Sequence, residues 1–152
     1  MRSGLTFRIN NHIFAYSREY GNMNKTIRNL KALSEPGRLR VLFLLYSAGE
    51  LCVCEIEQVL GMSASTASRN LRELETTGWL KSRREGRWIH YRLADLDSDW
   101  MSILNPIVAV FSKTAEAKYD LDRRHKILTE DHKTCIDHSA SLETFYEQVD
   151  RG

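Results

Sequence analysis

The sequence predicts a mainly α-helical chain with one β-hairpin, an α+β arrangement of the winged helix-turn-helix class. Three observations lead to this fold class. Apolar residues recur at helical spacing in five segments, a short turn separates the third segment from the fourth, and two alternating runs flank a glycine-containing connector. Within the 152 residues we expect an N-terminal extension over 1–22, a winged helix-turn-helix domain over 23–120 and a polar C-terminal tail over 121–152.

The first two helices are predicted from their apolar spacing and from the break between them. The first begins near Asn24 and carries apolar residues at every third or fourth position. Ser34 and Pro36 then fit the cap and the first turn of a second helix, which Gly49 ends.

A short third helix and a capped fourth helix follow. Residues 50–53 are expected to be extended and to lead into the third helix, which Gly61 ends. Ser63 caps the fourth helix. The apolar residues of the fourth helix share one narrow arc, so its small polar and charged residues face the opposite way.

The hairpin and a fifth helix complete the predicted domain. The runs 79–84 and 88–93 alternate between apolar and polar residues around a connector at 85–87, which predicts two strands and a tight turn. A fifth helix is expected from Asp97 or Ser98 toward Tyr119, and Pro106 should kink or divide it.

The charge is unevenly distributed along the chain. Residues 63–93 hold seven Lys and Arg against three Glu, a local net charge of +4, whereas the whole chain carries +2. A basic segment on a mildly acidic body is typical of a surface that faces phosphates. A winged-helix domain used for protein contacts is the alternative, and it would bind DNA weakly and with little salt dependence.

The fourth helix has the residue types that a DNA-reading helix needs. Its first turns would enter the major groove, where small hydrogen-bonding side chains and arginine suit bases and phosphates. We therefore predict double-stranded DNA as a partner. The expected contacts are Ser63, Ser65, Thr66, Ser68, Arg69, Asn70 and Arg72 of the fourth helix, with Arg84 and Arg87 of the hairpin.

The cysteine content favours free thiolates. Cys52, Cys54 and Cys135 are an odd number in a chain without a recognisable export signal, so a disulfide framework is not expected. Soft thiolates select soft ions such as As(III), Sb(III), Cd(II), Pb(II) or Cu(I). The same thiols could instead be oxidised, which makes a redox-responsive protein the competing interpretation.

Other classes of protein have less support. The apolar run at 41–46 is far shorter than the ~20 residues of a membrane-spanning helix, so we expect a cytoplasmic protein without membrane association. The sequence has no glycine-rich phosphate loop, no nucleophile elbow and no helix with paired metal-binding histidines, which argues against an enzyme.

Residues 33–93 resemble the ArsR/SmtB family of metal-responsive repressors. Four segments carry the resemblance: LSEPGRLR at 33–40, ELCVCEI at 50–56, LGMSASTASRNL at 60–71 and GRWIHYRL at 86–93. The resemblance implies a homodimer built on the first and last helices, operator binding by the fourth helix and the wing, and release of DNA on metal binding. Asn70 departs from the family, whose members often carry histidine there, but asparagine can still read adenine.

Within this resemblance, Cys52-Val53-Cys54 looks like the arsenic- and cadmium-sensing motif of the family. On an α-helix, positions i and i+2 point about 200° apart, whereas in an extended segment they share a face. Both sulfurs can therefore meet one ion only if the start of the third helix unwinds or is already unwound. Because that helix precedes the recognition helix, distorting it should disfavour the geometry that binds DNA.

The third metal ligand stays open. Arsenic sensors of this type often carry a third cysteine where this chain has Glu57, and related cadmium and lead sensors add N-terminal cysteines, which are missing before Cys52. Cys135 is the candidate third ligand, and a two-thiolate site is the alternative. A nitrogen site on the fifth helix is disfavoured because residues 98–124 contain no histidine. We expect no permanently bound cofactor and As(III) or Sb(III) as the inducer, with Cd(II) or Pb(II) as alternatives.

Overall fold

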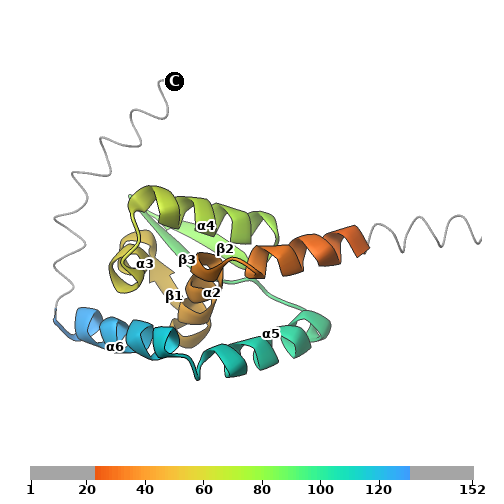
Figure 1. Ribbon diagram of the computed structural model, residues 1–152. Coiled ribbons are helices and arrows are strands. Elements are labelled where there is room, and N and C mark those ends of the chain that lie inside the picture. Colours follow the sequence, from red (N-terminus) through yellow and green to blue (C-terminus); the bar gives the residue numbers. More distant parts are fainter. Residues whose placement is uncertain (1–22, 131–152) are drawn as a thin grey trace, which may run out of the picture.

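The computed structural model describes residues 23–130. A helix over 23–33 precedes α2 (Pro36–Ala48), β1 (Glu50–Cys52), α3 (Val53–Leu60), α4 (Ala64–Thr76), β2 (Leu80–Glu85), β3 (Trp88–Leu93), α5 (Ser98–Phe111) and α6 (Ala115–Glu130). Figure 1 shows α4 along one side of the molecule and α5 and α6 along the opposite side, with α2, α3 and the strands between them. No helix in this part of the chain is long and apolar enough to cross a bilayer.

The strands form a three-stranded antiparallel sheet in the order β1-β3-β2. The predicted hairpin is confirmed: Leu80 pairs with Leu93, and Glu85 pairs with Trp88 across a turn in which Gly86 has a φ of 61°. On the other side of β3, Cys52 in β1 lies opposite His90. The segment that leads into α3 is therefore hydrogen-bonded to the wing.

The core is centred on α2. Residues 41–45 of this helix are all buried, because other elements surround it on nearly every side. Phe43 packs edge-to-face against Phe111, with ring centroids 5.1 Å apart, which joins α2 to the end of α5. Trp79 packs in the same way against Trp100 at 5.3 Å, and its indole N–H donates to the Asn29 carbonyl at 3.1 Å.

The predicted fifth helix is divided at a different place from the one expected. The sequence predicts a kink or a division at Pro106, and the division is wrong, because Pro106 lies inside α5, which continues to Phe111. The break falls where two hydroxyls compete for backbone groups. Ser112 Oγ donates to the Ala109 carbonyl at 2.9 Å, and Thr114 Oγ1 accepts from the Ala117 N–H at 3.2 Å at the start of α6.

The C-terminal boundary also differs from the expected one. The tail was predicted to start at 121, yet α6 extends to Glu130. Asp120 is fully buried against Arg40 of α2, and Ile127 packs against the core. The segment looked like a tail because most of its residues are polar, and the sequence alone does not indicate which carboxylate meets a buried partner.

Candidate metal site and nucleic-acid interface

The thiols of Cys52 and Cys54 lie together at the start of α3. Cys52 is the N-cap residue, with extended backbone angles (φ −77°, ψ 162°), so the helix begins only at Val53. The two sulfurs are 3.0 Å apart, and both side chains are buried. Metal–thiolate bonds of about 2.3 Å allow one ion to bridge two sulfurs at such a separation after a small adjustment. Cys52 thus precedes the helix and Cys54 lies in its first turn, so the two sulfurs meet without any unwinding of α3.

The surroundings of Cys52 favour its thiolate. A hydrogen bond with the Cys54 thiol is the largest influence, and together with the Glu55 N–H at 3.5 Å it lowers the pKa of Cys52 despite burial and the nearby Glu55 carboxylate. The Glu55 carboxylate in turn accepts from the Cys52 N–H at 2.7 Å, which completes a capping box. Metal binding needs the deprotonated thiol.

No third ligand stands beside the two thiols among the residues that the structure describes. Within that part of the chain no three His, Cys, Asp or Glu side chains are grouped so that they could hold a metal ion. Cys135 lies outside the described residues, so its role as a ligand stays a prediction.

The first turn of α4 presents small polar side chains. Ser63 is the N-cap, and its Oγ accepts from the Thr66 N–H at 3.3 Å and donates to Thr66 Oγ1 at 2.9 Å. Ser65, Arg69 and Arg72 are exposed, and Ser68 is half-buried. The cap therefore fixes the first turn of the helix, and the exposed residues form the surface that a groove could meet.

Asn70 does not belong to this surface. It is 3% exposed, and its amide donates to Met62 Sδ at 3.7 Å. A Cβ added at Gly37 would approach Asn70 Nδ2 to 2.8 Å, so Asn70 packs closely on the start of α2. The expected DNA contact through Asn70 does not fit this position, and we leave the residue out of the proposed interface. Helical periodicity alone could not reveal that a glycine on α2 makes room for it.

The wing arginines have two different environments. Arg84 and Arg87 are exposed near the tip, and Arg84 Nε donates to the Gly86 carbonyl at 2.9 Å. Arg83 instead binds the Glu50 carboxylate of β1 through Nη2 at 2.6 Å and also pairs with Glu85. These contacts raise the pKa of Arg83 and lower those of both glutamates. Strand alternation thus directs Arg83 to the carboxylates of Glu50 and Glu85 on the surface of the sheet and Arg84 to the opposite face. Sequence reasoning missed this surface network.

Comparisons with known proteins agree with this architecture. Residues 35–82 match the family described as "Bacterial regulatory protein, arsR family". The arsenic resistance transcriptional regulator ArsR2 of Pseudomonas putida is 42% identical over 71 residues, which are 47% of this chain and 62% of that protein. A cadmium resistance regulatory protein CadC homolog of Staphylococcus aureus is 42% identical over 65 residues, 43% of this chain and 54% of that protein. The chain thus spans little more than half the length of these curated relatives.

Solved structures give the same result. A homodimeric winged helix-turn-helix DNA-binding domain from Mycobacterium bovis, described as a possible ArsR-family transcriptional regulator, has a TM-score of 0.54 and 35% identity, covering 64% of this chain and 89% of that one. Fold and comparisons together define a winged helix-turn-helix protein. The chain belongs to the ArsR family of bacterial regulatory proteins.

Proposed function

We propose that this protein is a transcriptional repressor that binds operator DNA through α4 and the wing and leaves it when As(III) or Sb(III) binds Cys52 and Cys54. One observation carries the proposal: two buried thiols lie 3.0 Å apart at the N-cap of the helix that leads into α4. The exposed residues for DNA are Ser65, Arg69 and Arg72 on α4 with Arg84 and Arg87 on the wing, and Ser63, Thr66 and Ser68 lie in the same first turns.

The chemistry of the pair suits a thiophilic ion. Sulfur ligands select soft metals and metalloids, and the lowered pKa of Cys52 increases the fraction of thiolate at neutral pH. Cys135 is the proposed third ligand, since it follows α6 and α6 packs against α3. The names of the relatives include both arsenic and cadmium resistance, so Cd(II) and Pb(II) are the alternative inducers.

Ion binding would act on DNA through the cap of α3. The Cys52 sulfur accepts the Glu55 N–H in the metal-free protein, and an ion would draw on the same sulfur. Because α3 packs against α4, a shift at this cap would be passed to the recognition helix. A coupling of roughly 1–3 kcal/mol is typical of allosteric regulators and corresponds to a 5- to 150-fold loss of affinity.

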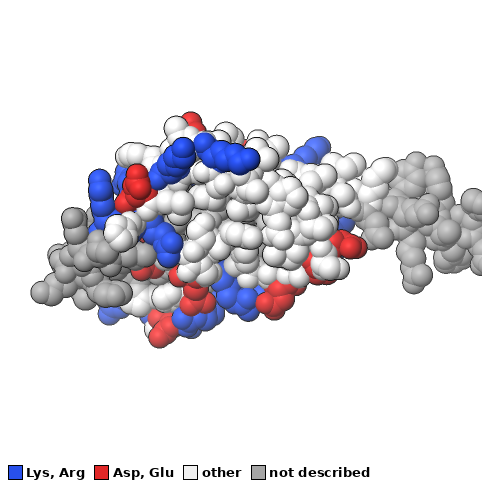
Figure 2. Space-filling model, turned by 90° about the horizontal axis from the view of Figure 1, so that it is seen from below, with Lys and Arg blue, Asp and Glu red and all other residues white. Residues whose placement is uncertain are grey.

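The proposed repressor is a homodimer. Large apolar side chains are exposed on the helix over 23–33 and on α5: Met23, Ile27 and Leu30 on the first, and Ile103 and Val110 on the second. Figure 2 shows the molecule from the side of α5 and α6, where the middle of the face has few charged side chains. Exposed apolar surface of this kind marks an interface, and two subunits would present two recognition helices to a two-fold operator.

A titration tests the proposed function. The reduced protein is bound to a duplex from upstream of its own gene, and arsenite, antimonite, cadmium, lead and zinc are added in parallel. We expect arsenite to release DNA from the wild type and not from Cys52→Ser or Cys54→Ser, with Cys135→Ser deciding the third ligand. Arsenite release that survives in both single variants would overturn the proposal, and release by cadmium or lead alone would change the inducer.

Thiol oxidation is the second candidate signal. The 3.0 Å contact between the sulfurs and the lowered pKa of Cys52 also suit attack of a thiolate on peroxide. Release of DNA by low doses of peroxide, reversed by a thiol reductant and insensitive to arsenite, would favour this candidate.

A further inference from the structure

The C-terminal end of α3 is held by side chains from two other helices. The last four carbonyls of a helix have no partner within it. Gly61, in the left-handed conformation (φ 62°), and Met62 direct their N–H groups to the Glu57 carbonyl. Two guanidinium groups then bind carbonyls of this end: Arg123 Nη2 donates to the Gln58 carbonyl, and Arg40 Nη2 donates to the Leu60 carbonyl at 3.2 Å.

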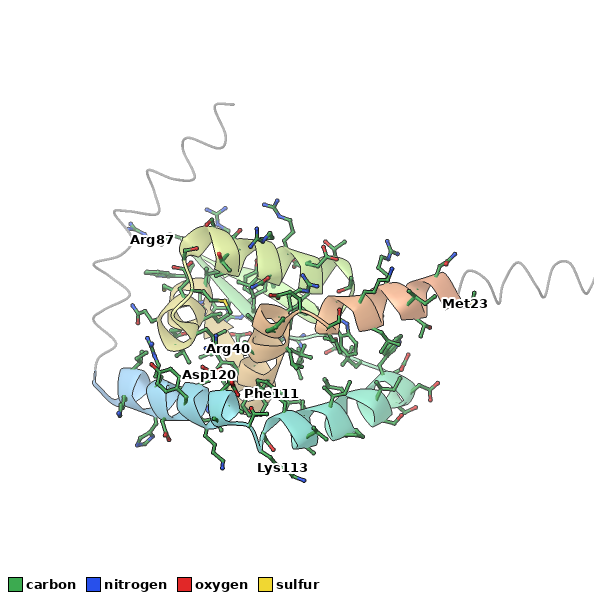
Figure 3. The ribbon with its side chains drawn as sticks, in the orientation of Figure 1. Met23, Arg40, Arg87, Phe111, Lys113 and Asp120 are labelled. Atoms are coloured by element: carbon green, nitrogen blue, oxygen red, sulfur yellow. The ribbon has the colours of Figure 1, made fainter. Side chains whose placement is uncertain are left out.

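Both guanidinium groups are oriented by α6. Arg40 extends from α2 and forms a two-pronged pair with Asp120, with Nε–Oδ2 at 2.8 Å and Nη2–Oδ1 at 2.6 Å. Asp120 is 0% exposed. Figure 3 shows these two side chains pointing toward one another between α2 and α6. Arg123 lies over the ring of Tyr119, one turn earlier on α6, at 5.7 Å from its centroid.

We call the three residues Arg40, Asp120 and Arg123 the arginine clamp. They hold the C-terminal end of α3, next to the turn that sets the position of α4. Only Gly61, Met62 and Ser63 separate α3 from α4. Positive charge at a helix C-terminus is favourable because it faces the negative end of the helix dipole. The clamp therefore fixes the end of α3 from which the recognition helix departs, while the thiols lie at its other end, about 12 Å away for a helix of eight residues.

We infer that Arg40, Asp120 and Arg123 are positioning residues, which hold the turn between α3 and α4 in the geometry that binds the operator. This inference rests on the proposed function and assigns to α6 a part in DNA binding, although α6 lies across the molecule from α4. Loss of the clamp should resemble the effect of the inducer: the metal-free protein would bind DNA more weakly, by roughly 5- to 150-fold, while the thiols would still bind arsenite.

The experiment compares Arg123→Gln and Asp120→Asn with matched variants on α6. Arg123→Gln removes the contact with Gln58 without leaving a buried charge, and Asp120→Asn keeps the shape of the side chain. Lys118→Gln and Asp122→Asn change the same charges at exposed positions of the same helix. Each variant is titrated onto the upstream duplex and onto an unrelated duplex, and its thermal midpoint and arsenite stoichiometry are measured in parallel.

Arg123→Gln should weaken binding to the upstream duplex with an unchanged arsenite stoichiometry, and Arg123→Lys, which retains a donor, should restore much of the affinity. The two exposed controls should bind as the wild type does. Wild-type affinity for the upstream duplex in a folded Arg123→Gln protein would overturn the inference. If Asp120→Asn does not fold, Arg123→Gln alone is sufficient for the test.

A second measurement does not depend on DNA. Hydrogen exchange of the Gly61 and Met62 amides in the free protein should become faster in Arg123→Gln and stay unchanged in Lys118→Gln. If these two amides exchange at the wild-type rate in Arg123→Gln, the positioning role of the clamp is wrong, even if the protein is a repressor. Faster exchange in a protein that never binds the upstream duplex would support the clamp and count against the proposed function.

Discussion

The two ends of α3 are held by contacts of very different strength. At the N-terminal end the helix N–H of Glu55 has only a cysteine sulfur, a weak acceptor, at 3.5 Å, and the one short bond is the reciprocal one from the Cys52 N–H to the Glu55 carboxylate at 2.7 Å. At the C-terminal end two guanidinium groups bind the carbonyls, and one of them is locked to a buried carboxylate at 2.6 Å. The weakly capped end carries the thiols, and the firmly held end is joined to the recognition helix. Under the proposed function, an ion would alter the first end at small cost while the second end would transmit the change.

The largest effect is expected from breaking the firmly held end. Arg40→Ala would leave Asp120 buried without its cation and remove the donor to the Leu60 carbonyl. Removing one partner of a buried pair is strongly destabilising, and because Arg40 is 25% exposed we expect a value at the lower end, a loss of about 3 kcal/mol in the free energy of unfolding. Urea denaturation measures it.

The double variant Arg40→Met/Asp120→Leu is the control for that loss. Replacing both charges with apolar side chains removes the desolvation cost along with the attraction, so most of the stability should return. If the double variant is as unstable as Arg40→Ala, the loss in the free energy of unfolding comes mainly from lost packing and not from the uncompensated carboxylate of Asp120.

A smaller effect should come from the glycine that ends α3. Gly61 and Gly78 both have positive φ, 62° and 80°, so alanine at either position should cost about 1–2 kcal/mol. A Cβ at Gly61 would lie 3.4 Å from Arg123 Nη1, whereas one at Gly78 meets nothing within 4 Å. Because 3.4 Å from the end of a flexible side chain is an ordinary contact, Gly61→Ala should cost about as much as Gly78→Ala in thermal unfolding. A clearly larger cost at Gly61 would show that the added methyl group displaces Arg123.

The two ends of α3 also differ in how well they could be predicted from the sequence. The N-terminal end follows from local signals, because the extended segment before the helix and the cysteine spacing are neighbours along the chain. The hairpin and the capped α4 were predictable for the same reason, since turn residues and periodicity act over a few positions.

The C-terminal end depends on contacts between distant residues, which periodicity does not encode. Arg40 and Asp120 are 80 positions apart, and Arg123 and Gln58 are 65 apart. Asp120 was the last residue of the expected domain and Arg123 lay in the expected polar tail, and both looked like ordinary surface charges. Asn70 shows the converse case. It was expected to contact DNA from the exposed face of α4, but it is buried against α2. A single sequence shows which residues could pair but not which are brought together.

The weak cap can be strengthened without touching the clamp. Serine is among the best N-cap residues, and Ser63 fills that role in α4 with an acceptor distance of 3.3 Å. Cys52→Ser should therefore stabilise the metal-free protein by roughly 0.5–1 kcal/mol, although it removes a thiol of the proposed arsenite site. Cys54→Ser, inside the helix, should bring no such gain. A loss of stability in Cys52→Ser would mean that burial of the sulfur outweighs its weakness as a cap.

The smallest expected effect is electrostatic and concerns the thiolate at the same cap. Because the Cys54 thiol and the Glu55 N–H lower the pKa of Cys52, folding favours its ionised form. The contribution to stability is present above the pKa of an unfolded cysteine, about 8.5, and is lost as the pH falls through the lower pKa of the folded protein. In a Cys135→Ser background, the ultraviolet absorbance of the thiolate should show a first titration step below that of the same protein with Cys54→Ala. As the pH rises from the lowered pKa of Cys52 in the folded protein to the pKa of an unfolded cysteine, the unfolding midpoint in urea should rise in the first protein and rise less in the second. If both proteins titrate alike, the Cys54 thiol does not stabilise the anion, and the affinity for ions that we propose for this end of α3 would rest on the position of the sulfurs alone.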